Sequence, residues 1–566
     1  YGWDTSYLCR MPAKITTYPL GYNEPLFMPT TSNATSTLAS GNCVADPNLG
    51  DIRRRRTFDW LSELMVDQQS CVINRLCDDE SKRKRAERFI NNEKLSASQV
   101  IEACCLPIGS VGVAGQTLLN VMDQSVLHLY SALGRMSGQI DELGMVSNGK
   151  HGGQNLVASL LVRPTDYGVI GLSSLLFHSV DPAALKSSER LGIDIRPFAY
   201  RQSDKWVRAA HQANARAIHA DQIIHVIDRE ADNLQVIGRI LNEHSPISND
   251  IVIRARFKDR RVVANHHDAH LGKGKIQDLL SNKSPILCYQ VNVPSDERMK
   301  LKHVDGKLQR KRYLERACKR QGRTAFLQVR HLSCQMDEQA LSKSRNGSLC
   351  GLQMRQFLAQ TKVCERTFNY IEVTEVDTQG HPICSSTKDY QPINWLLLTS
   401  CPINEPKDLI RTINIYRHRF GIIEQFFRCL KNDGFRVQQA QQQSLKSLQI
   451  VIAMAAKASA LILKMISARD QDEGFDIEED FTDQQIEVLQ LCLKRYQGRT
   501  SIQRNHHPPN QLSWAAWIIA RMGGWKPQNK QRPPGPKTFQ RGMEVFATLY
   551  QGVALAKGWD IDVSQP

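Results

Sequence analysis

The stretch Ile223-Ile-His-Val-Ile-Asp228 is a short apolar run that ends in an aspartate. A run of this length, rich in β-branched residues, predicts a buried strand that delivers the carboxylate at its C-terminal end. The stretch Thr117-Leu-Leu-Asn-Val-Met-Asp123 has the same pattern and predicts a second strand that ends in an aspartate. Beyond Asp228, apolar residues recur at helical spacing over residues 229–242. A strand followed by an aspartate and a helix predicts a parallel α/β element.

Further strands are predicted between residues 250 and 400, where β-branched and aromatic residues cluster. They cover residues 251–257, 324–330, 370–374 and 395–399. This pattern predicts a β-rich insertion at about 250–390, followed by a return to the core. Within it, Lys300 to Arg323 holds ten Lys or Arg residues and two acids. A loop on the DNA backbone and a solvated surface loop both fit that composition.

The two ends of the chain differ from the middle, which is predicted as a catalytic domain over residues 116–440. Residues 1–45 are rich in Thr, Ser, Asn, Pro and Gly and predict a flexible tail. Residues 46–115 predict a basic helical DNA-binding domain, because two runs of four cations in one small helical domain favour phosphate contacts. Residues 441–566 predict a helical domain rich in aromatic residues. Its apolar stretch from Leu448 to Ile466 contains two lysines and predicts a buried helix.

The bulk composition is that of a folded, multidomain protein with polyanionic partners. The chain has 566 residues, of which 41% are hydrophobic and 23% charged, and this length predicts several domains, each with its own hydrophobic core. A formal net charge of +16 favours nucleic acid as a partner, although a basic soluble surface fits equally well. The 15 cysteines include no C-x-x-C pair and no Gly-rich phosphate loop is present, which disfavours a zinc ribbon and an ATP-driven motor.

The segment from Tyr416 to Gly434 reads Tyr-Arg-His-Arg-Phe-Gly-Ile-Ile-Glu-Gln-Phe-Phe-Arg-Cys-Leu-Lys-Asn-Asp-Gly. On a helix, Glu424, Arg428 and Lys431 fall at positions i, i+4 and i+7 and share one face. One carboxylate is therefore predicted among cations on a helix packed against the core. Taken alone, this pattern is that of an amphipathic helix with a surface Glu-Arg pair.

This segment resembles the Y-R-E-K signature of the bacterial cut-and-paste transposases, the insertion-sequence-four family that includes the Tn-five transposase. Other segments similar to the family are Leu49-Gly-Asp51, Arg88-Phe-Ile-Asn-Asn92, Asp228-Arg-Glu-Ala-Asp232, Trp395-Leu-Leu-Leu-Thr399 and Ala520-Arg-Met-Gly-Gly-Trp525. The resemblance extends roughly from Leu49 to Ala556, far more than a chance motif match covers.

The sequence departs from the family pattern at two places. Four residues separate Arg419 from Glu424, one more than in the usual signature, whereas the spacing from Glu424 to Lys431 is the usual one. The first-aspartate region, Val121-Met-Asp123-Gln-Ser, also lacks the Asp-Thr-Thr form that is common in the family.

The resemblance implies a ribonuclease-H-like α/β catalytic core with Asp123, Asp228 and Glu424 as catalytic and metal-binding residues. Carboxylate oxygens suit Mg²⁺ or Mn²⁺, and two such ions about 4 Å apart serve both hydrolysis and strand joining. The resemblance implies that Arg428 and Lys431 neutralise nonbridging phosphate oxygens. The predicted DNA-binding residues are Tyr416, Arg419, Phe420, Arg428, Lys431, Arg53, Arg54, Arg55, Arg56, Arg83 and Arg88. Tyr416 or Arg419 would hold the strand end, and Phe420 is better explained as a core residue than as a base-stacking one.

The implied activity is DNA transposition by cleavage at transposon ends and strand transfer into target DNA. The implied partners are double-stranded DNA and a second copy of the chain, joined through residues 441–566 in a synaptic homodimer. A bacterial cytoplasmic protein, nucleoid-associated when bound to DNA, is expected. Two alternatives stay open: a nuclease with the same core that no longer transposes, and a catalytically dead DNA-binding relic.

Three other polar features have simpler explanations than catalysis. The cluster His266-His-Asp-Ala-His270 lacks zinc-like spacing to cysteine and predicts a surface loop. His225 is predicted to be packed in its strand. Asp232 is explained better by the electrostatics of a helix N-terminus than as a fourth metal ligand.

Overall fold

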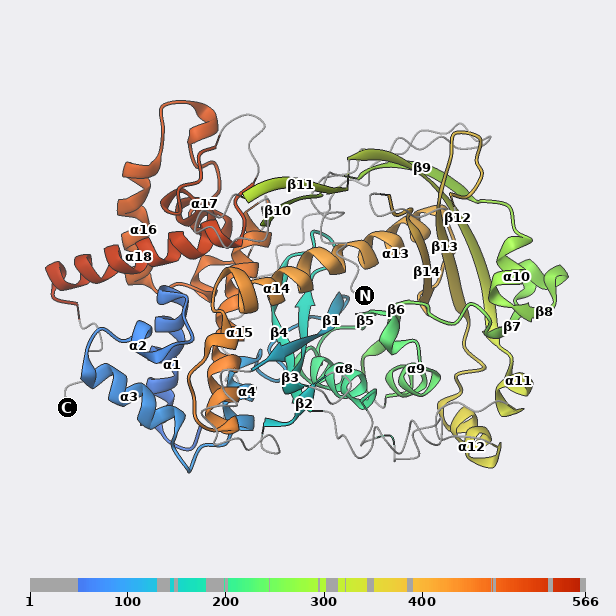
Figure 1. Cartoon of the computed structure of the whole chain (residues 1–566), viewed down its shortest axis with the longest axis horizontal. Coiled ribbons are helices and arrows are strands. Elements are labelled where there is room, and N and C mark those ends of the chain that lie inside the picture. The colour runs from blue at the N-terminus through green and yellow to red at the C-terminus, as the bar shows by residue number, and fades with distance from the viewer. Residues whose placement is uncertain are drawn as a thin grey trace, which may run out of the picture. The chain divides into compact units, whose positions relative to one another are not determined.

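The computed structural model shows a mixed α/β protein (Figure 1). It describes residues 49–129, 143–146, 151–179, 198, 202–243, 245–293, 296–301, 314–320, 322–343, 351–383, 390–469, 471, 475–527 and 533–559. The predicted tail, residues 1–45, lies outside the described residues. Contacts divide the chain into two compact units. Among the described residues, unit 1 comprises 226–243 and 250–421, and unit 2 comprises 49–225, 245–249 and 422–559.

The strands of unit 2 form an antiparallel set joined by a further strand. Their bounds are β1 Thr117–His128, β2 Met145–Val146, β3 His151–Val162, β4 Val169–His178 and β5 Gln222–Ile227, of which β5 ends in unit 1. The strand order is β2-β3-β1-β5, and β4 pairs with β3. Helix α8 (Asp204–Arg216) packs on β1, β3 and β4 and buries Trp206 there. Because apolar residues of β1 and β3 are buried on both faces, this set is core rather than surface.

The predicted helical N-terminal segment consists of four helices. They are α1 Ile52–Gln68, α2 Ile73–Leu76, α3 Glu80–Ile90 and α4 Ala97–Cys104. Helix α1 begins after Asp51, whose carboxylate accepts from the backbone N–H of Arg54 at 2.8 Å. Asp79 caps α3 in the same way, and Ser96 forms a capping box with Gln99 at the start of α4.

Helix α15 (Leu445–Ala468) is the central helix of unit 2, and α1 and α4 pack beside it (Figure 1). The helix is long and apolar enough to cross a membrane by length and composition, but most of it is buried inside the structure. Its two lysines are accommodated within the protein: Lys464 pairs with Glu479 and Asp480, each at 2.8 Å, and Lys457 lies over the Phe58 ring. The prediction of a buried helix from Leu448 to Ile466 is therefore confirmed.

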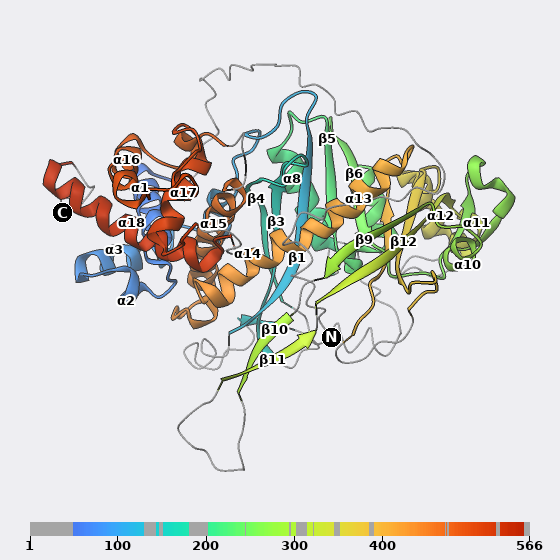
Figure 2. The ribbon, with the colours of Figure 1, turned by 90° about the horizontal axis from the view of Figure 1, so that it is seen from above.

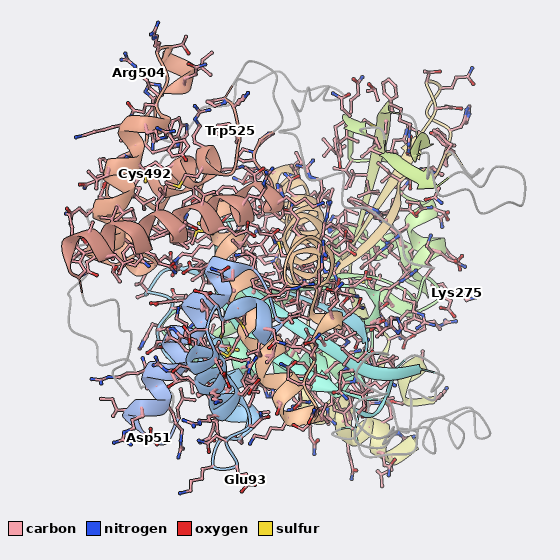
Figure 3. The ribbon with its side chains drawn as sticks, turned by 60° about the vertical axis from the view of Figure 1, so that its left-hand side comes forward. Asp51, Glu93, Lys275, Cys492, Arg504 and Trp525 are labelled. Carbon is pink, nitrogen blue, oxygen red and sulfur yellow. The ribbon has the colours of Figure 1, made fainter. Side chains whose placement is uncertain are left out.

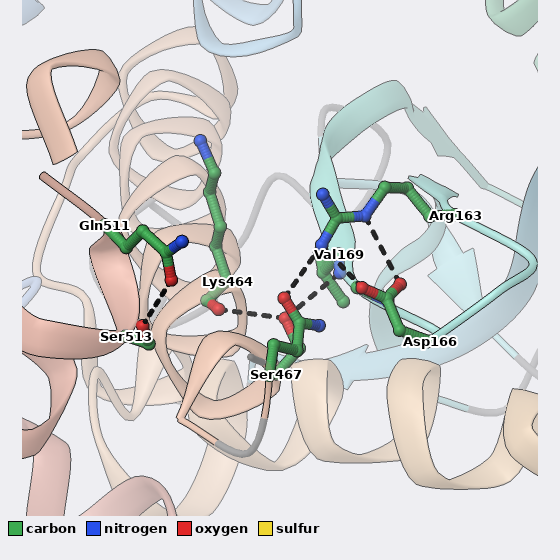
Figure 4. A network of polar contacts seen from close by, with 9 residues as sticks. Arg163, Asp166, Val169, Lys464, Ser467, Gln511 and Ser513 are labelled. Carbon is green, nitrogen blue, oxygen red and sulfur yellow. Dashed lines mark hydrogen bonds and ion pairs between the residues drawn. The ribbon is translucent and has the colours of Figure 1, made fainter. Parts of the chain in front are cut away.

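A polar network ties the end of α15 to the turn between β3 and β4 (Figure 4). Arg163 pairs with Asp166 at 2.6 Å and donates to Gln471 at 2.8 Å. The backbone N–H of Val169 donates to the hydroxyl of Ser467 at 3.1 Å. These bonds satisfy the polar groups of the turn and fix the strands against the helix.

The C-terminal helices bury the aromatic residues that the sequence concentrates there. The elements are η7 Ile477–Glu479, α16 Asp483–Tyr496, η8 Ser501–Gln503, α17 Leu512–Met522 and α18 Pro536–Lys557. Trp514, Trp517, Phe539 and Phe546 are all buried in one core cluster of unit 2. The chain's own helices therefore cover these four side chains, and the joining of two copies through residues 441–566 stays a prediction.

Unit 1 contains a second set of strands and most of the predicted insertion. Its strands are β6 Ser248–Arg254, which begins in unit 2, β7 Arg261–Ala264, β8 Lys273–Lys275, β9 Leu287–Val293, β12 Arg323–Met336, β13 Phe368–Val376 and β14 Asn394–Thr399. The order is β6-β14-β13-β12-β7-β8, and β9 lies alongside β12 (Figures 1 and 2). Its helices are η2 Arg229–Ala231, α9 Leu234–Leu241, η3 His266–Leu271, α10 Ile276–Ser281, α11 Glu338–Lys343, α12 Gly351–Thr361 and α13 Pro406–Arg419.

The four strands predicted between residues 250 and 400 are confirmed, but the insertion is not a separate sheet. Strand β14, the predicted return to the core, pairs with β6 on one side and with β13 on the other. Each edge of a strand carries backbone N–H and C=O groups that can pair with another strand, and β14 pairs along both of its edges. The insertion strands therefore belong to the same sheet as β6. In the basic segment, β10 (Asp296–Leu301) and β11 (Leu314–Arg320) form a two-stranded ribbon where a loop was predicted, and residues 302–313 lie outside the described residues.

Candidate functional site

Asp228 follows directly after β5, as the sequence predicts. The apolar strand ends at Ile227, and the half-buried carboxylate then meets a side chain from far along the chain. The hydroxyl of Tyr416, on α13, donates to Asp228 Oδ1 at 3.0 Å. Both residues belong to unit 1. Tyr416 and Asp228, which two separate sequence patterns singled out, are therefore in contact.

The charge of Asp228 is stabilised by its surroundings. Burial acts to raise its pKa, but the Arg419 guanidinium, the backbone N–H of Arg229, the Tyr416 hydroxyl and the Arg254 charge together hold that pKa below the ordinary value of 3.8. The carboxylate is thus ionised at neutral pH, the state required of a ligand for a hard cation. The sequence alone did not single out Arg254, which is the last residue of the buried strand β6.

Tyr416 is held by an aromatic cluster. Its ring makes edge-on contacts with Trp395, at 6.0 Å between centroids, and with Phe420, at 5.4 Å. Tyr416 is 0% exposed, Arg419 1% and Phe420 5%. These fractions support the core role of Phe420 and show that Tyr416 and Arg419 are buried rather than on the surface. Direct contact of Tyr416 or Arg419 with a DNA strand end stays a prediction.

We expect Tyr416→Phe to destabilise the protein in a pH-dependent way. A hydrogen bond to a charged group contributes about 1.5–3 kcal/mol. Because the folded pKa of Asp228 lies below its unfolded value, this contribution is present above pH 3.8 and is lost as pH falls through the folded pKa. Denaturant unfolding of the wild type and the variant should therefore differ at pH 7 and converge in acid. If the free energies of unfolding of the wild type and the variant differed equally at both pH values, the hydroxyl would contribute only packing.

The position of Asp123 differs from the prediction. Strand β1 continues five residues beyond it to His128, so Asp123 lies in the middle of the strand, opposite Ala158 on β3. The polar residues Gln124 and Ser125 do not end the strand, because this part of β1 is only half-buried and tolerates polar side chains. Asp123 is itself half-buried, and its Oδ1 accepts from the backbone N–H of Gln124 at 2.8 Å.

Glu424 ends a π-helical turn, η4 (Phe420–Glu424), inside the signature helix. Helix α14 (Gln425–Arg428) follows, and a second π-helical turn, η5 (Cys429–Asp433), ends the segment. A π-helical turn contains one residue more than an α-helical turn. The extra residue between Arg419 and Glu424 therefore coincides with a backbone feature that takes up one residue.

The two cations predicted to share a face with Glu424 point to different surroundings. Lys431 is half-buried, and its ammonium donates to Ser125 Oγ at 3.1 Å and to the carbonyl of Val126 at 2.7 Å. Burial lowers the pKa of Lys431. Arg428 is exposed. Lys431 thus reaches β1 two residues beyond Asp123, a contact within unit 2 that the sequence did not indicate.

The three predicted carboxylates are divided between the units. Asp123 and Glu424 belong to unit 2, and Asp228 belongs to unit 1. Among the described residues, no group of three or more His, Cys, Asp or Glu side chains is placed to hold a metal ion. The donor set still fits Mg²⁺ or Mn²⁺ chemically, because Asp228 is held ionised and all three side chains offer hard oxygen atoms. The metal site stays a prediction.

His225 and Asp232 have structural roles. His225 is 0% exposed and bonds to Asn120 at 3.1 Å and to Asn249 at 2.9 Å, which confirms that it is packed. Asp232 does not cap α9, because Asn233 does so. Its carboxylate instead accepts from the backbone N–H groups of residues 256 and 257, at 2.6 and 3.1 Å, and pairs with Arg260 at 2.6 Å. It therefore anchors the segment after β6.

The predicted histidine loop is the short helix η3. Its Asp268 is 7% exposed and pairs with Lys283 at 2.5 Å, so this residue is structural rather than part of a solvated loop.

The arginines of the N-terminal helices fall into two groups. Arg54, Arg55 and Arg83 form ion pairs with acids of their own helices. Arg53, Arg56 and Arg88 are exposed. In Figure 3, Asp51 marks the start of α1, and Glu93 lies in the turn between α3 and α4. The exposed group has the greater freedom to contact phosphate, because an arginine that already has an acidic partner must lose it first.

No protein-family model matches the chain. Among solved structures, the chain is similar to a cryo-EM structure of the piggyBac transposase synaptic complex with hairpin DNA. The match covers 91% of this chain and 74% of that chain, with 9% sequence identity and a TM-score of 0.32. A TM-score of this size does not establish a common fold, so the match assigns neither fold nor function to this chain.

Proposed function

We propose that the chain is a DNA transposase that cleaves transposon ends and transfers the strands into target DNA. The observation that carries the proposal is the hydrogen bond from Tyr416 to Asp228. Two motifs identified separately in the sequence, 188 residues apart, meet in the structure, and Arg419 of the same signature helps to keep Asp228 ionised. An ionised carboxylate at the end of a buried strand suits metal-dependent phosphodiester chemistry.

A ribonuclease-H-like core is part of this proposal. It is supported by the antiparallel set of β4, β3 and β1, by the place of β5 next to β1, and by helix α8 before β5. Asp123 lies on β1 and Asp228 directly follows β5. Carboxylates carried by neighbouring strands are what a metal site in such a core requires.

Asp123, Asp228 and Glu424 are proposed to hold two Mg²⁺ or Mn²⁺ ions. When bound, the ions would activate a water molecule or a 3′-hydroxyl and stabilise the leaving 3′-oxygen. Tyr416, Arg419 and Arg254 keep Asp228 ionised and oriented. The exposed Arg428 is proposed to contact nonbridging phosphate oxygens. Lys431 holds its helix against β1 through Ser125 and Val126, and it is proposed to contact phosphate oxygens as well.

The proposed partners are double-stranded DNA at transposon ends and target sites and a second copy of the chain in the synaptic complex. A bacterial cytoplasmic location, on the nucleoid when DNA is bound, is proposed with them. The test is cleavage of a duplex that carries the DNA flanking the coding region. Metal-dependent nicking followed by strand joining supports a transposase, and nicking without joining supports the nuclease alternative. Binding without nicking supports the DNA-binding relic.

We expect the exposed arginines of the N-terminal helices to account for more of the salt dependence of DNA binding than the paired ones. Loss of one phosphate contact lowers the slope of log K against log salt by about 0.9. Arg56→Gln and Arg88→Gln should each produce a change of this size, whereas Arg55→Gln, which removes a partner of Asp59, should produce a smaller one. Binding of the full chain to duplex DNA across a salt series measures all three. If all three variants had the same slope of log K against log salt as the wild type, these helices would not be part of the DNA interface.

A further inference from the structure

A basic cavity of about 290 Å³ lies within unit 2, and none of Asp123, Asp228 and Glu424 lines it. It is lined by residues from the end of α1, from α2, from the segment after η5 and from the first turns of α18. Three cations line it, Arg75, Arg436 and Lys537, and all three are exposed. One carboxylate, that of Glu544, also lines it. The side chains around the cavity therefore carry a formal excess of positive charge.

The backbone that presents Arg436 is held in an unusual conformation. Arg436 has φ 49° and ψ 49°, in the left-handed region that few residues other than glycine adopt. The carbonyl of Phe435 accepts from the thiol of Cys71 at 3.1 Å, and the carbonyl of Arg436 accepts from the backbone N–H of Gln439 at 2.7 Å. Such a conformation persists where its surroundings enforce it, and it often marks a functional position.

Gln540 supplies the second observation. This residue lines the cavity and is only 5% exposed, yet its amide nitrogen has no hydrogen-bond partner among the described residues. A buried N–H donor without an acceptor is costly, which implies an acceptor that binds from outside. Gly434 allows the close approach of this amide, because a Cβ there would lie 2.0 Å from Gln540 Nε2.

The start of α18 adds to the positive potential. The helix has 22 residues and begins at Pro536 after Gly535, and no side chain caps its N-terminus. Helix N-termini carry a partial positive charge and favour anions. Lys537 and Gln540 project from the first turns of this helix into the lining of the cavity.

We propose that this cavity binds a phosphate group. Three cations, a helix N-terminus and a buried N–H donor together match an oxyanion that accepts hydrogen bonds from several directions. The phosphate is that of a DNA backbone, an assignment that rests on the proposed function, whereas phosphate binding itself rests on the cavity alone. The cavity lies beside the segment that follows the Glu424 helix, so a phosphodiester held there would fix the duplex relative to that helix.

The first measurement is thermal unfolding of the full chain in inorganic phosphate against chloride at matched ionic strength. Phosphate should raise the unfolding midpoint of the wild type by about 2 °C or more, because it binds the folded state. Arg436→Gln, Lys537→Gln and Gln540→Met should each lose most of this shift. Arg495→Gln on α16, exposed and in the same unit, is the matched control and should keep it. If phosphate did not raise the unfolding midpoint of the wild type, or raised it equally in all variants, the proposal that this cavity binds phosphate would be wrong.

The second measurement distinguishes DNA from free phosphate. Arg436→Gln and Lys537→Gln should each lower the salt slope of duplex binding by about 0.9, and Arg495→Gln should not. If phosphate raises the unfolding midpoint but the salt slope of duplex binding is the same in the variants as in the wild type, the cavity binds free phosphate. That result would overturn the assignment to a DNA backbone. Lys537 is exposed, so its variant tests the proposal even if Gln540→Met does not fold. Failure of the proposed function would appear separately, as absence of nicking by the wild type with the phosphate shift intact.

Discussion

We expect Asp228→Asn to reduce metal-dependent nicking by about a thousandfold or more while the fold and DNA binding persist. Asparagine keeps the shape of the side chain, and its oxygen still accepts from Tyr416, but it lacks the anionic charge that Mg²⁺ requires. A metal ion contributes several kcal/mol of transition-state stabilisation, and each 1.36 kcal/mol is about a factor of ten in rate. Nicking of the flanking-DNA duplex across a Mg²⁺ series measures the effect.

Glu230→Gln is the matched control for this prediction. Glu230 lies two residues beyond Asp228 and is exposed. Its substitution removes one negative charge from the same segment, as Asp228→Asn does, but should leave nicking unchanged. Asp228→Asn also removes the charged partner of Arg419 and Arg254, so its unfolding is measured in parallel. Nicking by a folded Asp228→Asn protein within a few fold of wild type would exclude Asp228 as a ligand.

The parts of the fold that the sequence predicted depend on local patterns. The run that ends at Asp228 is continuous and apolar, so both the strand and the place of its carboxylate follow from side-chain burial alone. The stretch from Leu448 to Ile466 is apolar apart from Gln449, Ser459 and two lysines, a composition that favours a buried helix, and α15 meets this expectation.

The features that the sequence did not predict depend on contacts between distant segments. Polar residues after Asp123 suggested the end of a strand, but pairing with β3 carries β1 on to His128. The sequence explains Asp232 by the electrostatics of a helix N-terminus, but its partners are the backbone of residues 256 and 257 and the side chain of Arg260. Trp514 and Trp517 are as apolar as interface residues, and only the folded chain shows that its own helices bury them.

The segment from Tyr416 to Gly434 illustrates the same limit. The sequence shows one extra residue between Arg419 and Glu424 but does not show where the backbone takes it up. The π-helical turn η4 spans residues 420–424, the interval that contains the extra residue. Such turns arise inside α-helices and frequently lie at functional sites. The insertion is therefore compatible with a working site, and this makes Glu424 the residue on which the proposal is tested most sharply.

We expect Glu424→Gln to reduce nicking by about a thousandfold or more and to leave duplex binding unchanged. Gln matches Glu in size and in helix propensity, so η4 should persist, and only the anionic oxygen is lost. The missing charge impairs the placement of a cation, so we expect the rate of nicking to fall by the same order as in Asp228→Asn. Nicking and binding are measured on the same flanking-DNA duplex, with Gln425→Glu in the wild-type background to show whether a carboxylate one position away alters the rate.

Asp433 is the rival for the role of third ligand. On a continuous α-helix a step of nine residues turns the side chain by about 180°, which would place Asp433 and Glu424 on opposite faces. The segment is not a continuous α-helix, because Asp433 ends the second π-helical turn, η5, and this angle does not apply. The two acids must therefore be separated by experiment. If Asp433→Asn abolishes nicking while Glu424→Gln retains it, the third ligand is Asp433, and the signature register that places Glu424 in the site is wrong.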